Sequence, residues 1–295
     1  MCLYLLLLVS KMFVGVRDIP ESYGFSGLFE MLDDLNVKSF ELKINKKLRF
    51  PKEVEASFKR KFGIKEVYNL SMLRKCLERE DYVISAILAE NDFMPGILEA
   101  EVRYVLSCCK MAKELGVDVV RINGPMHEIK GFKIEDYVRT TSLALNIIKS
   151  EYKIMLAIEN HGVIGNRPEF LKKLFQHYNV EFLGLTLDTG NFYWYGHPLS
   201  KVYEIIEMFA NRVKHTHIKN AKVPVDAREK TRKPGEVEMT PLYEGDIDLG
   251  KVISILDKAG YDKDLTIEDE SMGKFKAEER RTIIKKDVEH LLQFI

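Results

Sequence analysis

Residues 154–159, Ile-Met-Leu-Ala-Ile-Glu, form a short apolar run that ends in a carboxylate, and this pattern decides the fold. The same pattern returns at residues 182–188, Phe-Leu-Gly-Leu-Thr-Leu-Asp. Apolar runs of about four to eight residues are typical of strands that are buried on both faces. The chain contains eight candidate strands: Phe13–Val16, Ser39–Lys43, Tyr82–Leu88, Val117–Ile122, Ile154–Glu159, Phe182–Asp188, Val213–Ile218 and Leu265–Glu268.

Amphipathic stretches separate these runs. In the stretch Glu99–Leu115, the apolar residues Val102, Val105 and Cys109 recur at helical spacing, and Gly116 follows as a stop. The other predicted helices are Ile134–Ser150, Pro168–His177, Leu199–Phe209, Leu249–Ala259 and Ala277–Phe294. Strands that alternate with helices predict a parallel sheet, and eight such units predict a single-domain (β/α)₈ TIM barrel.

Two features qualify this prediction. A doubly wound open sheet is the alternative fold, but no glycine-rich phosphate loop follows the first strand, which disfavours a nucleotide-binding version. The longest stretch that shows neither the helical nor the strand spacing of apolar residues is Asn220–Glu244, which contains three prolines and many charged residues. We expect it to be an irregular, functional loop.

Composition limits the function classes. The chain has 45 Lys and Arg residues against 45 Asp and Glu residues, so its formal net charge is zero. A dedicated nucleic-acid binder usually carries a basic excess that neutralises phosphates, so we expect no nucleic-acid partner. The four cysteines lack metal-ligand spacing, and this usage indicates a reduced, cytoplasmic protein.

The N-terminus contains a separate apolar run, Cys2–Val9. It is shorter than the about 20 residues that span a membrane, and it lacks the basic start and cleavage site of a signal peptide. We therefore expect residues 1–11 to be an apolar extension, residues 12–295 to be the barrel, and no membrane partner. No helix carries an outer apolar stripe that defines an interface, so a homo-oligomer is allowed but not specified.

Charged residues occupy the strand ends that form the active site of such a barrel. Alternation along the strands points Glu159, Asp188, His217 and Glu268 inward, with their aliphatic neighbours toward the helices. Buried like charges repel, so this cluster predicts one divalent cation that offsets them. Two Glu, one Asp and one His suit Mn²⁺, Mg²⁺, Co²⁺ or Zn²⁺, and we expect Mn²⁺ first.

Three further residues near the strand ends are candidate substrate contacts: Arg121, His161 and Lys219. Each has an alternative role. Arg121 can form an ion pair with Glu41 or Glu159, Lys219 can pair with a carboxylate, and His161 can be a turn residue. His215 points inward one layer deeper, and we expect it to be a hydrogen-bonded histidine of the core or behind the ligands.

Four segments in order resemble the sugar phosphate isomerase/epimerase family, whose xylose isomerase-like TIM barrel is related to endonuclease IV. They are Ala-Ile-Glu-Asn-His-Gly (157–162), Leu-Asp-Thr-Gly-Asn (187–191), His-Thr-His-Ile-Lys-Asn (215–220) and Thr-Ile-Glu-Asp-Glu (266–270). The resemblance implies metal ligation by Glu159, Asp188, His217 and Glu268. It implies that Glu159 and Glu268 also transfer the proton, and that a polar residue three after Asp188 contacts substrate. Asn191 stands there, where several relatives carry His.

The resulting hypothesis is a metal-dependent sugar isomerase or epimerase that acts on a ketose, a ketose phosphate or a related polyol carbonyl. One glutamate would take the α-proton and the other would return one, through an enediolate that the ion stabilises. Two alternatives stay open. One is an endonuclease IV-like enzyme that repairs abasic DNA, which needs more histidines than these positions offer. The other is a non-catalytic barrel that binds a sugar.

Overall fold

Eight parallel strands form the centre of the computed structural model, which describes residues 12–295. In chain order they are β1 (Phe13–Arg17), β2 (Ser39–Ile44), β3 (Val83–Ala89), β4 (Val119–Asn123), β5 (Met155–Glu159), β6 (Leu183–Asp188), β7 (Val213–His217) and β10 (Asp264–Ile267). Around the sheet the order is β10-β1-β2-β3-β4-β5-β6-β7. A bridge between Ile218 and Ile267 brings the two edges together. The sheet is therefore the predicted barrel.

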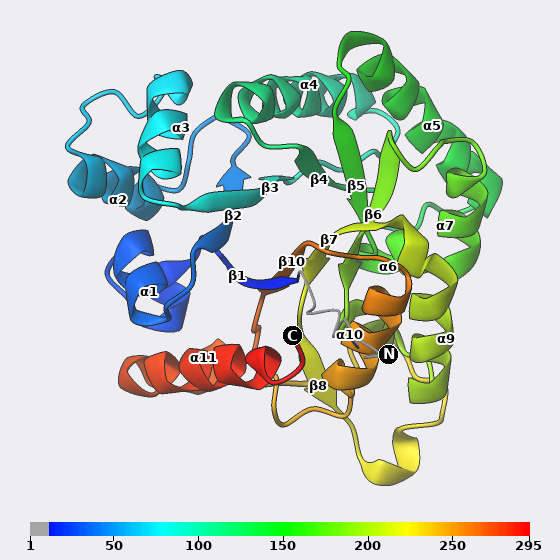
Figure 1. Cartoon of the computed structure of the whole chain (residues 1–295). Coiled ribbons are helices and arrows are strands. Elements are labelled where there is room, and N and C mark those ends of the chain that lie inside the picture. The colour runs from blue at the N-terminus through cyan, green and yellow to red at the C-terminus, as the bar shows by residue number, and fades with distance from the viewer. Residues whose placement is uncertain (1–11) are drawn as a thin grey trace, which may run out of the picture.

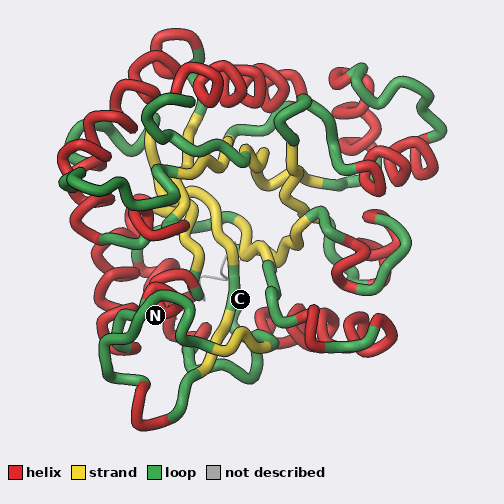
Figure 2. Tube along the Cα trace, turned by 180° about the vertical axis from the view of Figure 1, so that it is seen from behind, coloured by secondary structure: helices red, strands yellow, loops and turns green. Residues whose placement is uncertain are grey.

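Helices surround the strands (Figure 1), and the view from behind shows the strands enclosed by helices and loops (Figure 2). They are α1 (Leu28–Asp34), α2 (Lys52–Phe62), α3 (Leu70–Arg79), α4 (Leu98–Leu115), α5 (Ile134–Glu151), α6 (Gly162–Gly165), α7 (Pro168–Phe175), α8 (Asn191–Tyr195), α9 (Leu199–Phe209), α10 (Leu249–Lys258) and α11 (Ala277–Leu292). Each predicted strand and helix is present, and its ends differ by two residues or fewer. None of the described helices combines the length and the apolar character needed to cross a membrane.

Several elements differ from the expectation, and one part of the chain lies outside the described residues. The helices α1, α2, α3, α6 and α8 were not predicted. The stretch Asn220–Glu244, expected to be irregular, contains an antiparallel hairpin of β8 (Asn220–Lys222) and β9 (Glu238–Thr240). Strands of three residues are too short for period-two alternation to appear in the sequence. The expected extension at residues 1–11 is the part outside the described residues.

The hydrophobic core lies mainly between the strands and the surrounding helices. On β6, the side chains of Leu183, Leu185 and Leu187 are fully buried in this layer. A second, small apolar cluster of Ala86, Val119 and Ala157, packed by Met155, is separate from it. These residues come from three neighbouring strands, β3, β4 and β5, so the small cluster fills part of the barrel interior. Polar side chains are thus left to occupy the space near the strand ends.

The register of the sheet sets the strand ends side by side. Asn123 of β4 pairs with Glu159 of β5, and Asp188 of β6 pairs with His217 of β7. Paired residues of neighbouring strands point to the same face of a sheet. Because Asp188 points into the barrel, its partner His217 points into the barrel as well.

Candidate metal centre

The four residues predicted to bind metal lie together at one end of the barrel. Glu159, Asp188 and His217 end their strands, and Glu268 directly follows β10. Each offers one ligand atom, and these atoms all lie within 4.8 Å of one another. The first three are buried, whereas the side chain of Glu268 is 14% exposed. The arrangement can therefore surround one ion and leave it accessible from the Glu268 side.

The chemistry of these donors fits a divalent cation. Asp188 Oδ2 and His217 Nδ1 are buried and make no hydrogen bond of acceptable geometry. His217 Nδ1 faces carboxylate oxygens, with Glu268 Oε2 at 3.1 Å and Glu159 Oε2 at 3.4 Å. Three carboxylates and one imidazole nitrogen form a mixed oxygen and nitrogen set that Mn²⁺, Mg²⁺ and Zn²⁺ accept. Glu159, Asp188, His217 and Glu268 would hold the ion.

Cationic side chains balance the carboxylates of this cluster. Arg121 forms a buried ion pair with Glu159. Lys219 Nζ lies 2.9 Å from Asp188 Oδ2 and 2.9 Å from Glu268 Oε2, so one ammonium group bridges two of the candidate ligands. Without such partners, buried carboxylates would take up protons rather than remain charged.

The pKa values reflect this balance. Burial raises the pKa of Asp188 to about 6, and Lys219 offsets only part of that effect. Burial would also raise the pKa of Glu159, but Arg121 and His217 outweigh it and hold this pKa well below its usual range. Glu159 is therefore the firmly ionised member of the cluster, and Asp188 is the one whose charge depends on its surroundings.

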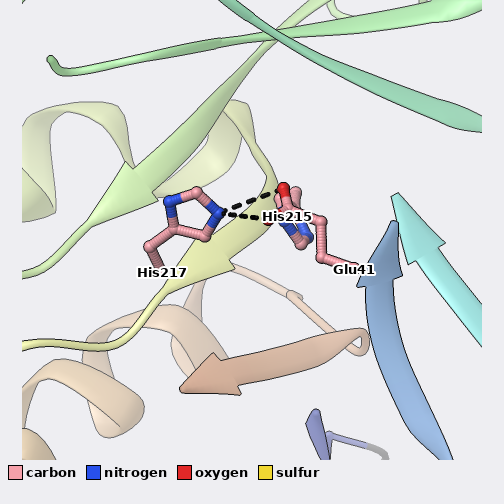
Figure 3. A group of neighbouring side chains, drawn as sticks. All are labelled: Glu41, His215 and His217. Carbon is pink, nitrogen blue, oxygen red and sulfur yellow. Dashed lines mark hydrogen bonds and ion pairs between the residues drawn. The ribbon is translucent and has the colours of Figure 1, made fainter. Parts of the chain in front are cut away.

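Behind the four ligands lies a second group that connects to His217 (Figure 3). His217 Nε2 donates a hydrogen bond to Glu41, whose oxygens lie at 3.0 and 3.1 Å. Glu41 Oε1 also lies 3.0 Å from His215 Nε2, and Arg17 Nε lies 2.7 Å from Glu41 Oε2. His215 Nδ1 faces Asp264 Oδ2 at 2.8 Å. Burial would lower the pKa of His215, but Asp264 and Glu41 raise it to about 9.

A cavity of about 360 Å³ opens at the cluster. Its charged and imidazole-bearing walls are Arg17, Glu90, Asp92, Arg121, Glu159, His161, Lys219, Glu268 and Glu270. A larger hollow of about 700 Å³ between α5 and α7 lies on the helical exterior and contains none of these residues. The cavity at the strand ends is therefore the candidate active site.

The predicted substrate contacts do not all reach this cavity. Arg121, His161 and Lys219 line it, and each also has a partner in the protein. Arg121 pairs with Glu159, and His161 Nδ1 lies 3.1 Å from the side-chain oxygen of Asn123. Asn191 is not among the described residues that line the cavity. Its side-chain amide instead donates to Glu159 Oε1 at 3.2 Å.

Two residues of the site, Arg17 and Glu41, were not predicted as functional. Both are buried charged residues inside the barrel. Period-two alternation could have found them: Val16 of β1, and Phe40 and Leu42 of β2, belong to the core. Their neighbours Arg17 and Glu41 must then point inward.

Comparisons with known proteins agree with this architecture. The sequence profile of the family described as xylose isomerase-like TIM barrel matches residues 29–294. No curated protein matches the sequence.

Three similar solved structures are an IolI protein with a bound zinc atom, a D-tagatose 3-epimerase-like protein, and the probable 3-DHS dehydratase AsbF of Bacillus anthracis. The IolI protein is 15% identical with a TM-score of 0.70 over 96% of this chain and 99% of its own. The epimerase-like protein is 19% identical with a TM-score of 0.62 over 96% and 99%. The dehydratase is 13% identical with a TM-score of 0.66 over 95% and 99%. These likenesses show a shared fold.

Proposed function

The chain belongs to the xylose isomerase-like TIM barrel family, and we propose that it is a divalent-metal-dependent isomerase or epimerase of a ketose, a ketose phosphate or a related polyol carbonyl. The name of the D-tagatose 3-epimerase-like structure supports the epimerase class, and the zinc atom of the IolI structure supports a divalent metal. A third similar structure is named a probable dehydratase. The same chemistry leads to dehydration if the enediolate expels a neighbouring hydroxyl group.

The observation that carries the proposal is the convergence of four ligand atoms at the end of a polar cavity. Glu159 and Glu268 line the cavity, whereas Asp188 and His217 are fully buried. Its volume of about 360 Å³ falls within the range of small-molecule sites. A bound divalent ion would supply Lewis-acid polarisation of a substrate carbonyl.

Within this site the two glutamates would move the proton. Glu159 is ionised, because Arg121 and His217 outweigh the effect of burial on its pKa. Glu268 forms ion pairs with Arg17 and Lys219. Each carboxylate can accept a proton from the carbon next to a carbonyl group and return it. Return to the opposite face gives an epimer, and return to the neighbouring carbon gives the isomeric aldose or ketose.

The remaining charged walls would orient the substrate. Arg121 and Lys219 carry several N–H groups at the cavity, which can donate to hydroxyl oxygens. The three described cysteines, Cys76, Cys108 and Cys109, are free thiols, which supports a reducing compartment such as the cytoplasm.

Proton exchange in D₂O tests the proposal. The protein is stripped with a chelator, reloaded with Mn²⁺, and incubated with ketoses, ketose phosphates and inososes, while proton NMR follows the α-hydrogen. We expect metal-dependent exchange on at least one compound, together with new signals of an epimer, isomer or dehydration product. Glu159→Gln and Glu268→Gln should each abolish the exchange.

Glu278→Gln on the exposed face of α11 makes the same change of charge at a residue that does not line the cavity, and it should leave the exchange rate unchanged. Metal-loaded protein that exchanges no α-hydrogen across the panel would contradict the proposal. Metal-dependent cleavage of DNA at an abasic site would replace it with the repair activity.

A further inference from the structure

We propose that Glu41 is a positioning residue of this centre: it takes the Nε2–H of His217 and thereby presents the lone pair of Nδ1 to the ion. This inference rests on the proposed metal-dependent function. It assigns a role to a residue that contributes no ligand atom to the group formed by Glu159, Asp188, His217 and Glu268. It also identifies which of the two ring nitrogens of His217 is the ligand.

The geometry around His217 separates the two nitrogens. Nε2 lies 3.0 and 3.1 Å from the two oxygens of Glu41, and Nδ1 faces the candidate ligands Glu159 and Glu268. An imidazole that binds a metal is neutral and carries a single N–H. An ionised carboxylate only accepts hydrogen bonds, so the proton belongs on Nε2. Both side chains are fully buried, so water does not compete for either group.

Glu41 is itself held in place from two other strands. Arg17 of β1 contacts Oε2 at 2.7 Å, and His215 of β7 contacts Oε1 at 3.0 Å. Both nitrogens of His215 face a carboxylate, Glu41 on one side and Asp264 on the other. His215 Nε2 thus holds Glu41 from one side, while its Nδ1 faces Asp264. The guanidinium of Arg17 is the fixed cation beside Glu41, and a carboxylate held in this way accepts the proton of His217 on Nε2.

The same contacts argue against a second ion at this place. Glu41, His215 and His217 also offer ligand atoms within 4.8 Å of one another. An ion bound there would face the guanidinium of Arg17 and would need both histidines to release the protons that Glu41 accepts. The group is therefore a hydrogen-bonded support, and we infer one ion per chain. Carboxylates that orient a metal-binding histidine typically change metal affinity by about 10–100-fold when they are replaced.

The matched control is Asp18→Asn. Asp18 is fully buried like Glu41 and follows Arg17 in the chain, but its Oδ2 accepts from the backbone N–H of Lys43 and it contacts no histidine. At pH 8.5, Asp18→Asn and Glu41→Gln each remove one buried negative charge near Arg17. Only Glu41→Gln removes the acceptor for His217.

Two measurements with Zn²⁺ as the probe decide the inference. Long-range ¹H–¹⁵N NMR of the wild-type protein at pH 8.5, metal-free and with Zn²⁺, locates the His217 proton. Calorimetric titration of stripped protein at the same pH gives the affinity and the stoichiometry. We expect the proton on Nε2, one Zn²⁺ per chain, binding about 10–100-fold weaker in Glu41→Gln, and little change in Asp18→Asn. Circular dichroism confirms that both variants are folded.

Several results would overturn the inference. In the NMR measurement, the result is a proton on Nδ1 of His217 in the wild-type protein. In the titration, the results are two Zn²⁺ ions per chain, equal Zn²⁺ affinities of Glu41→Gln and wild type, or equal losses of Zn²⁺ affinity in Glu41→Gln and Asp18→Asn. The NMR result uses wild-type protein only, so it decides the inference even if Glu41→Gln does not fold. A wild-type protein that binds no Zn²⁺ contradicts the proposed function instead, and the tautomer of the metal-free protein still tests the role of Glu41.

Discussion

Removal of Arg121 should destabilise the metal-free protein strongly. The exposed fractions of the Arg121 and Glu159 side chains are 5% and 1%, so the ion pair is shielded from water. Arg121→Met keeps much of the side-chain volume and leaves the carboxylate without its cation. Removing one partner of a buried pair costs about 3–5 kcal/mol. Asn191 still donates to Glu159 and His217 still faces it, so we expect the lower end, about 3 kcal/mol.

Metal should reverse part of this loss. A divalent ion beside Glu159 would replace the missing positive charge, and it would bind more tightly once Arg121 no longer repels it. An ion present at 100 times its dissociation constant stabilises a folded protein by about 2.7 kcal/mol. The difference in stability between Arg121→Met and wild type should therefore be smaller with Mn²⁺ than with a chelator.

Urea unfolding followed by circular dichroism, with Mn²⁺ and with a chelator, measures both effects. In chelator, the double variant Arg121→Met/Glu159→Gln should be more stable than Arg121→Met, because no buried charge is left unpaired. Arg212→Met is the control, since Arg212 donates to the backbone carbonyls of Phe175 and Tyr178 and its loss should not depend on metal. Wild-type stability of Arg121→Met in chelator, or a double variant less stable than the single one, would refute the reasoning.

Three further predictions concern the surroundings of the site. Burial raises the pKa of Asp18 to about 7 from 3.8, so the folded state binds this proton more tightly and stability is lost as pH rises toward 7. Urea unfolding should therefore show that the free energy of unfolding of Asp18→Asn rises by about 2–3 kcal/mol relative to wild type between pH 5 and pH 8. Free energies of unfolding that change with pH in the same way for both proteins would contradict this prediction. Gly162→Ala should cost at least about 2 kcal/mol in the same assay and weaken Mn²⁺ binding, because φ is +67° and the new Cβ would lie 2.7 Å from the Met126 carbonyl oxygen. Gly63→Ala, at φ +65° with no atom within 4 Å, should cost less, and an equal cost would show that the contact is unimportant. Burial raises the pKa of Cys108 to about 12, so mass spectrometry after treatment with a maleimide should find this thiol unmodified until the protein unfolds, and rapid labelling of native protein would contradict it.

Much of the site could be predicted because its main signal is local. A strand of period two points alternate residues to one face, so Glu159 and Glu268 could be directed inward from their own strands alone. Of the elements that were missed, the helix α3 also carries such a signal, since Leu70, Leu73 and Leu77 recur at helical spacing. The hairpin does not. The β8–β9 hairpin has strands of three residues, too short for a period to be counted. Arg17 and Glu41 carried the same alternation, but no chemical motif on β1 or β2 drew attention to them.

The sequence by itself determined the barrel and the convergence of the four candidate ligands. Both follow from periods of 2 and 3.6 residues, which are set by the geometry of a single strand or helix. Only the tertiary structure decided how the charges pair. The sequence left Arg121 free to pair with Glu41 or Glu159, and the fold pairs it with Glu159. It joins Glu41 instead to His215, 174 residues away. Such pairs depend on which side chains meet across a closed barrel, and no local period carries that information.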